Sequence, residues 1–229
     1  MLTERDIEIL RLIARVGAAG AEHVMGGFGV GRSQAHARLG RLCGEGLIAR
    51  RALLYRRPAL YVATRAGLRM CGLSHLGVAS VSAAGFEHAW QACSAAVALA
   101  DARPDWRLLG EREVRGAERE RQALLASVRL SGPGGGGWLH RPDLALLAPD
   151  GRVLAIEVEL SVKAPRRLAA ICRAYARARH IEHVFYFASP RVRAALGRAL
   201  ARERAGERIT VLALGCFELP AQYTSTEVS

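Results

Sequence analysis

The first third of the chain carries apolar residues at helical spacing, interrupted by glycines, and then changes to short apolar runs. The helical spacing predicts amphipathic helices, and Thr3 and Ser33 are expected to cap the first and third of them. Two short apolar runs joined by an arginine-bearing turn predict a β-hairpin, after which Thr64 is expected to cap a further helix. The predicted elements are helices over residues 3–16, 21–25 and 32–43, strands over 47–51 and 58–63, and a helix over 65–71.

The rest of the chain alternates strand-length apolar runs with helix-length patterns. Its predicted elements are a helix over 86–99, a strand over 106–111, a helix over 118–128, a glycine-rich turn over 131–137, two strands flanking a tight turn at 149–151, and then helix 166–179, strand 182–187, helix 190–204 and strand 209–214. This order predicts an α+β or α/β fold with a mixed sheet. We therefore expect domains over residues 1–78 and 86–220, a linker over 79–85 and a tail over 221–229.

Positive charge is the first indication of function. The chain has 33 Lys and Arg against 21 Asp and Glu, a formal net charge of +12. Residues 1–78 alone hold 12 arginines against 5 acids. Cations of this density favour a polyanionic partner, because binding to phosphates releases condensed counterions. The alternative is compositional, since the chain is rich in arginine throughout and Lys163 is its sole lysine.

Three helices followed by a hairpin have the order of a winged helix-turn-helix domain. The stretches LTERDIEILRLIARVG, GRSQAHARLGRLCGEGLI and ALYVATRAGLRM resemble winged-helix DNA-binding proteins. The resemblance implies that the third helix faces bases and nearby phosphates and that the hairpin holds the DNA backbone. The residues implied are Arg32, Ser33, Gln34, His36, Arg38 and Arg41 on the helix, and Arg50, Arg51, Arg56 and Arg57 on the hairpin. The alternative is a wing that binds protein, with these charges on a solvated face.

Acidic residues on two predicted strands form a second candidate site. In the run 156–160 strict alternation sends Glu157 and Glu159 to one face, roughly 7 Å apart along the strand. Asp143, at the start of the preceding strand, could add a third carboxylate, and magnesium is the ion expected to bind such a cluster. Lys163 follows closely enough for its ammonium to reach the carboxylates. The alternative is structural: Asp143 caps a turn, Lys163 caps the strand, and the glutamates pair with arginines 166 and 167.

The second domain resembles the PD-(D/E)XK nuclease superfamily, which implies a restriction-endonuclease-like α/β fold. Pro142-Asp143 matches its first acid and Glu157 its second, whereas the expected lysine position holds Glu159 and the lysine is displaced to Lys163. The resemblance implies phosphodiester hydrolysis, with Asp143, Glu157 and Glu159 holding magnesium, or manganese as a substitute, and Lys163 orienting the attacking water. Glu118 could add an acid. Together with the first domain, the motifs HRPD, EVELSVK and FYF resemble the replication-relaxation family of plasmid and mobile-element proteins.

We therefore expect a DNA-binding protein of plasmid or mobile-element replication or relaxation that acts as a metal-dependent DNA nuclease. The alternative is a non-catalytic winged-helix regulator whose degenerate nuclease-like domain serves for dimerisation or partner binding. Double-stranded DNA is the expected partner, and a homodimer is one expected assembly. The chain lacks a run of about 18 apolar residues and a basic-then-apolar start, so we expect no membrane span and a cytoplasmic location.

Overall fold

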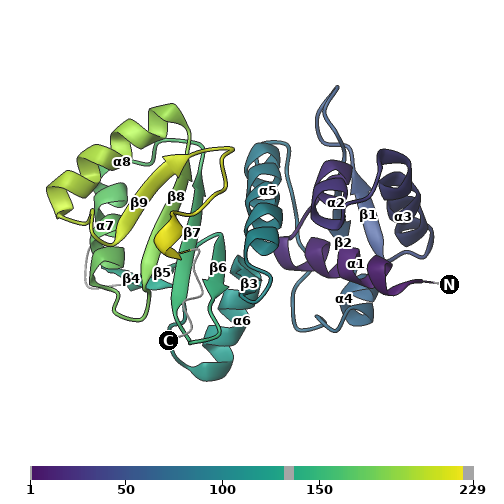
Figure 1. The fold of residues 1–229 in the computed structure, drawn as a ribbon, viewed down its shortest axis with the longest axis horizontal. Coiled ribbons are helices and arrows are strands. Elements are labelled where there is room, and N and C mark those ends of the chain that lie inside the picture. The colour runs from purple at the N-terminus through teal and green to yellow at the C-terminus, as the bar shows by residue number, and fades with distance from the viewer. Residues whose placement is uncertain (1, 132–136, 224–229) are drawn as a thin grey trace. The chain divides into compact units, whose positions relative to one another are not determined.

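The computed structural model describes residues 2–131 and 137–223, which form eight α-helices, a mixed five-stranded sheet and two smaller sheets (Figure 1). The expected mixture of α and β structure is confirmed. The chain divides into two compact units, Met1–Val97 and Ala98–Ser229, and the division falls within one helix, α5 (Phe86–Ala102). Within the described ranges, no helix is both long and apolar enough to cross a membrane.

The first unit consists of helices around one two-stranded hairpin, in the predicted order. Its elements are α1 (Glu4–Val16), α2 (Ala21–Phe28), α3 (Arg32–Gly44), β1 (Ile48–Arg51), β2 (Leu60–Ala63), α4 (Arg65–Met70) and the start of α5. Thr3 caps α1 as expected, because its hydroxyl accepts a hydrogen bond from the Asp6 N–H and the Asp6 carboxylate accepts one from the Thr3 N–H. The expected Ser33 cap is wrong, since α3 already begins at Arg32 and Gly31 holds the N-cap position.

The hairpin of the first unit is covered on both faces. One face packs into the core between α1 and α3, where Ile13, Leu39 and Ile48 are buried. The other face packs against the start of α5, where Leu60 of β2 meets Phe86. The antiparallel pairing runs from Ile48 opposite Ala63 to Arg51 opposite Leu60. This double burial holds the two strands, and the arginines that follow Ala49, in a fixed position against the helices.

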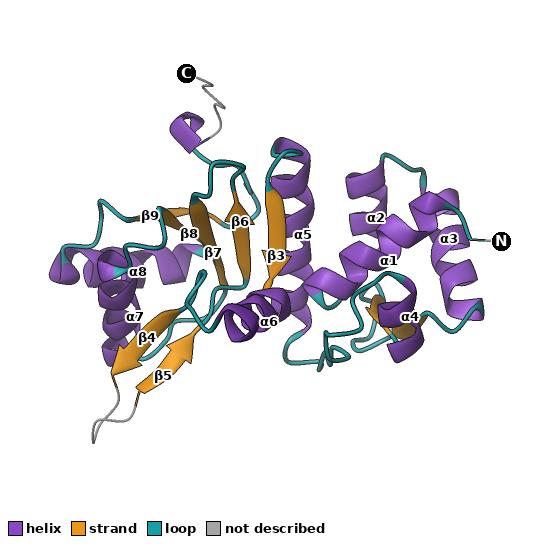
Figure 2. Ribbon diagram, turned by 90° about the horizontal axis from the view of Figure 1, so that it is seen from below, coloured by secondary structure: helices purple, strands orange, loops and turns teal. Residues whose placement is uncertain are grey.

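The second unit is built around a sheet with strand order β3-β6-β7-β8-β9 (Figure 2). Neighbours among β3, β6 and β7 are antiparallel, whereas β8 and β9 continue the sheet in parallel with β7. The strands are β3 (Arg107–Gly110), β6 (Leu144–Leu147), β7 (Val153–Glu159), β8 (His183–Ala188) and β9 (Ile209–Ala213), and the helices are α6 (Glu111–Arg121), α7 (Pro165–Arg177) and α8 (Pro190–Glu203). All seven residues of the central strand β7 are buried.

A second hairpin, formed by β4 (Val128–Ser131) and β5 (Gly137–His140), lies on the same side of the sheet as α6 and α7 (Figure 2). The predicted helix over 118–128 is therefore wrong. The helix begins earlier, where the Glu113 carboxylate accepts the Gly110 N–H, and it ends at Gln122, which adopts a left-handed conformation. Residues 132–136, most of the predicted glycine-rich turn, lie outside the described residues.

The face of β7 that carries its odd-numbered residues is the face that α6, α7 and the second hairpin cover. Val153 belongs to a cluster with α6, and Ala155 to a cluster with α7 and β4. Alternation along the strand therefore turns Glu157 and Glu159 toward the same layer. At the C-terminal end, Ala221–Tyr223 forms a short 3-10 helix, and the Tyr223 hydroxyl lies 2.8 Å from Nδ1 of His183 on β8.

Candidate functional site

A groove in the first unit collects predicted DNA-contacting residues from both α3 and the hairpin. The groove has a volume of about 340 Å³ and lies between α2, α3 and β1. Arg32 and His36 reach it from the first turns of α3, Arg50 from β1, and Arg57 from the connection between the strands. All four of these residues are exposed. Residues from separate elements therefore form one basic surface.

Further predicted residues are exposed outside this groove. Ser33 and Gln34 lie on the first turn of α3, and Arg51 ends β1. The tip of the hairpin carries Tyr55, which is 90% exposed, with the Arg56 guanidinium 5.9 Å from its ring centroid. Arg56 has a φ of 56°, the left-handed backbone conformation of a tight turn. The hairpin thus ends in an aromatic ring and a cation that face solvent.

Arg38 and Arg41 have a partner within the protein. The carboxylate of Asp6, a fully buried side chain of α1, accepts hydrogen bonds from Arg38 at 2.8 Å and Arg41 at 3.4 Å. Burial alone would raise the pKa of Asp6, but hydrogen bonds from Thr3 and Arg38 outweigh burial and lower the pKa below its usual value. These two arginines therefore tie α3 to α1 while part of each remains exposed to solvent.

Arg57 is also engaged in part. Its guanidinium forms an ion pair with Glu87 of α5 and lies 5.3 Å from the centroid of the Phe86 ring. Both members of the ion pair are about half exposed, with side-chain exposures of 47% each. A surface pair of this kind contributes little to stability and can be exchanged for a phosphate contact at small cost.

In the second unit, the predicted carboxylates lie on two adjacent strands. Leu144 of β6 pairs with Ile156 of β7, so Asp143, just before β6, is beside Glu157. The Asp143 carboxylate accepts a hydrogen bond from the Val158 N–H at 2.7 Å. Asp143 thus joins the start of one strand to the backbone of the next, which is a structural task.

Glu157 is buried and accepts two hydrogen bonds on the same oxygen, Oε1. The Tyr175 hydroxyl of α7 donates at 2.6 Å, and Nε2 of His140 on β5 lies at 2.7 Å. Burial, reinforced by the Glu157 charge, raises the pKa of Tyr175 far above its usual value, so the phenol keeps the proton that it donates. Sequence reasoning missed both partners. The sole signal for Tyr175 is a hydroxyl-bearing side chain on the apolar face of a helix.

Glu159 forms an ion pair with Lys163, the residue predicted to assist catalysis. Burial lowers the pKa of Lys163, while the nearby charges of Glu157 and Asp143 act in the opposite direction. The four predicted catalytic residues are therefore close together at the end of β7. The partners of the two glutamates are Tyr175, His140 and Lys163, whereas the structural alternative assigned this task to arginines of α7.

The arrangement does not fit a divalent ion held by three carboxylates. Glu157 Oε1 and Asp143 Oδ2 already accept hydrogen bonds from the protein, and Glu159 faces an ammonium group. Over residues 2–131 and 137–223, no group of three or more His, Cys, Asp or Glu side chains is arranged to hold a metal ion. Over these ranges, the protein donors therefore compete with a divalent ion for carboxylate oxygens of this cluster.

Glu118 has a structural role in place of the catalytic one suggested for it. Its carboxylate accepts hydrogen bonds from the backbone N–H groups of Leu125, Ala126 and Ser127 at 2.9–3.3 Å, and from the Ser127 hydroxyl at 2.7 Å. Burial would raise the pKa of Glu118, but these hydrogen bonds outweigh burial and lower the pKa. Glu118 thus fixes the loop that leads from α6 into β4.

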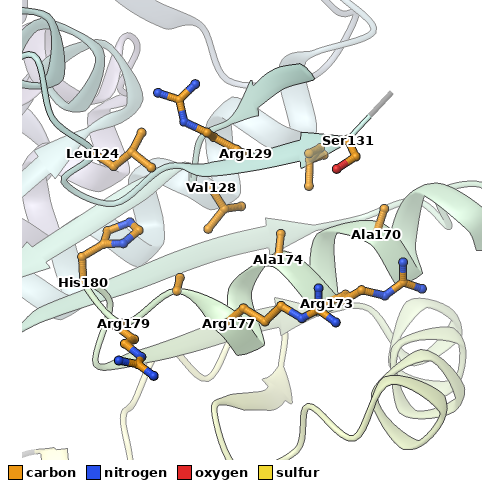
Figure 3. Close-up of a pocket in the computed structure, with 12 residues that line it drawn as sticks. Leu124, Val128, Arg129, Ser131, Ala170, Arg173, Ala174, Arg177, Arg179 and His180 are labelled. Atoms are coloured by element: carbon orange, nitrogen blue, oxygen red, sulfur yellow. The ribbon is translucent and has the colours of Figure 1, made fainter. Parts of the chain in front are cut away.

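A cavity of about 360 Å³ lies between β4 and α7 (Figure 3). Ala170 and Ala174 of α7 point toward the strand, and Val128 of β4 points toward the helix (Figure 3). Arg173 on the rim forms a bidentate ion pair with Glu203, with bonds of 2.7 and 3.1 Å. The cavity wall therefore combines aliphatic side chains with several arginines, one of which is neutralised by Glu203.

The basic groove and the carboxylate cluster are the two places where residues predicted to be functional come together. Neither a scan against protein-family models nor searches of curated proteins and of solved structures finds a match to this chain.

Proposed function

We propose that the chain binds double-stranded DNA through its first unit, acting as a winged helix. In this proposal α3 enters the major groove and the β1–β2 hairpin lies along the phosphate backbone. The observation that supports it is the groove in which Arg32 and His36 of α3 face the same space as Arg50 of β1. Helix and hairpin then contact one duplex together.

Charge and exposure support the same conclusion. Arg32 and Arg50 are exposed, and within the described part of the chain neither has an ion-pair partner. Such guanidinium groups are available for phosphates, each of which releases condensed counterions when it is neutralised. Ser33 and Gln34 lie on the same exposed turn of α3, and in this proposal they contact base edges.

We infer that the second unit serves this protein without cleaving DNA, as a regulatory or partner-binding module. Each carboxylate that a magnesium-dependent nuclease would use is engaged within the protein: Glu157 by Tyr175 and His140, Glu159 by Lys163, and Asp143 by the Val158 N–H. A role in the replication or relaxation of plasmid or mobile-element DNA remains the proposed setting, and it rests on the sequence resemblance.

DNA binding is tested by fluorescence anisotropy with a labelled duplex of mixed sequence. The double variant Arg32→Ala/Arg50→Ala is expected to bind about tenfold or more weakly, because each charged hydrogen bond to phosphate contributes about 1.5–3 kcal/mol. The slope of log affinity against log salt should fall by about one for each phosphate that the variant no longer neutralises.

The matched control is Arg69→Ala, which removes an exposed arginine of α4 that does not line the groove. Its affinity and salt dependence should stay close to those of the parent chain. Equal reductions in affinity in the control and in the double variant, or no reduction in either, would overturn the proposed interface.

The inference about the second unit is tested separately with supercoiled plasmid. The purified chain is incubated with magnesium or manganese, and the topological forms are separated on a gel. The plasmid is expected to stay supercoiled. Nicking that disappears in Asp143→Ala or Glu157→Ala would instead establish the nuclease and refute the non-catalytic role.

A further inference from the structure

The second unit contains a hollow lined by arginines from three separate segments. The hollow has a volume of about 480 Å³ and lies between α6 and the face of the β4–β5 hairpin that points away from α7. We call it the arginine hollow. Its cations are Arg115 and Arg119 of α6, Arg129 of β4 and Arg141 after β5, and its apolar wall includes Leu124 and Leu139.

The hairpin places two of these arginines on one face. Arg129 pairs with Leu139 across the hairpin, and alternation puts Arg141 on the same side as Leu139. Figure 3 shows the Arg129 side chain leaving β4 on the side opposite Val128, which points toward α7. On α6, Arg115 and Arg119 are one turn apart and so share a face.

The positive charge of the arginine hollow is only partly compensated. Arg115 is paired with Glu111, and Arg141 lies 3.7 Å from Glu118. The Glu118 carboxylate is already saturated by three backbone N–H groups and a hydroxyl, and the Arg141 Nε is a buried donor without a hydrogen-bond acceptor among the described residues. Within the same part of the chain, no ion pair involves Arg119 or Arg129.

We propose that the arginine hollow is a binding site for phosphate groups, carried by a nucleotide or by a nucleic acid strand. Four guanidinium groups around one hollow offer paired N–H donors that match phosphate oxygens. A phosphate between them would bind the exposed guanidinium groups of Arg119 and Arg129, which have no ion-pair partner among the described residues. The leucines give a base an apolar surface, and a volume of about 480 Å³ falls within the usual range of ligand sites.

This site is independent of the proposed DNA-binding surface, because it is formed by different residues in a different unit. It gives the second unit a function that needs no metal and no catalytic carboxylate. If the ligand is a nucleotide, the protein would respond to that nucleotide. If it is a nucleic acid strand, the chain would have a second nucleic-acid-binding site.

The experiment measures binding by calorimetry to the full chain carrying Arg32→Ala and Arg50→Ala, so that the groove of the first unit does not contribute. The probes are pyrophosphate, ATP and a short single-stranded oligonucleotide. Adding Arg119→Ala and Arg129→Ala is expected to lower the affinity for whichever probe binds by about tenfold or more. Neither truncation removes an ion pair seen in the described part of the chain, so the fold should be retained, as circular dichroism can check.

Arg193→Ala is the matched control, since Arg193 is an exposed arginine of α8 outside the hollow. Binding of pyrophosphate or ATP that depends on Arg119 and Arg129 identifies a nucleotide site. Binding of the oligonucleotide alone with the same dependence identifies a strand site. The proposal is overturned if no probe binds, or if Arg193→Ala weakens binding as much as the double truncation does. Failure here would leave the DNA-binding test of the first unit unaffected.

Discussion

His23 links α2 to α5 through a buried hydrogen-bond network that should make the first unit sensitive to pH. Nδ1 of His23 accepts the Gly20 N–H at 2.8 Å, and Nε2 lies 3.1 Å from the Trp90 carbonyl oxygen and 3.0 Å from the Ser94 hydroxyl. With Nδ1 as acceptor, the ring is the neutral form that donates from Nε2. Burial lowers the pKa of His23 from 6.5 to about 4, partly offset by its bond to Trp90.

The sign and size of the effect follow from linkage. In the unfolded chain the imidazole takes up a proton below pH 6.5, whereas in the folded chain it stays neutral down to about pH 4. The contribution of neutral His23 to folding stability is therefore fully present above pH 6.5, and it is lost as the pH falls from 6.5 to about 4. At pH 5 the loss is about 2 kcal/mol, and it approaches about 3 kcal/mol near pH 4.

The assay is urea unfolding of a chain whose sole tryptophan is Trp90, obtained with Trp106→Phe and Trp138→Phe, at pH 7.5 and pH 5. Trp90 packs on His23 with ring centroids 4.4 Å apart, so its fluorescence reports on this contact. His23→Asn keeps an acceptor for the Gly20 N–H but does not titrate. The variant should be less stable than its parent at pH 7.5. Between pH 7.5 and pH 5, its free energy of unfolding should fall by about 2 kcal/mol less than that of the parent.

The comparison between His23→Asn and its parent isolates His23, because contributions from other titrating groups cancel. His183, whose pKa is also lowered by burial, is present in both proteins. The reasoning is refuted if the asparagine variant shows the same pH dependence as its parent. It is equally refuted if the parent is as stable at pH 5 as at pH 7.5.

Three further predictions concern stability. Gly67→Ala should lower the free energy of unfolding in urea by about 3 kcal/mol, because the added Cβ would collide with the Leu47 carbonyl oxygen. Gly40→Ala, with open space around it, should be neutral or stabilising. Glu118→Gln should lose about 2 kcal/mol at pH 7, and because the pKa of Glu118 is lowered, the parent should lose this contribution in acid below about pH 4.5, as denaturation at several pH values can measure. Tyr175→Phe removes the 2.6 Å hydrogen bond to Glu157 and should lose about 1–3 kcal/mol; an unchanged melting temperature would contradict this role.

Much of the element order could be predicted because local patterns are strong where one face is buried. The run from Ile156 to Leu160 alternates strictly, and its residues as far as Glu159 form the end of β7. Thr3 with Asp6 forms the capping box that starts α1. The prediction for the α6 region is wrong because apolar residues 123–126 resemble a continuing helix. In the structure, Glu118 holds these residues in a loop through their backbone N–H groups.

The site was harder to predict because hydrogen-bond partners are set by tertiary structure. The sequence pattern indicated that Asp143 and Glu157 would be close, and their strands are indeed adjacent. It gave no means of seeing that Tyr175 and His140 would share one Glu157 oxygen, or that Asp6 would engage the arginines of α3. Spacing constrains residues on one element, whereas contacts across elements depend on how those elements pack.

The β4–β5 hairpin has four residue pairs and, over the described ranges, no third strand beside it, whereas β7 is bonded to a strand on each side. Amide protons of this hairpin should exchange with solvent deuterium through small local openings, and those of β7 only through larger ones. A ligand that bridges Arg129 to α6 would slow deuterium uptake in the hairpin and leave β7 nearly unchanged. Peptide-resolved exchange would thus locate the ligand without any substitution.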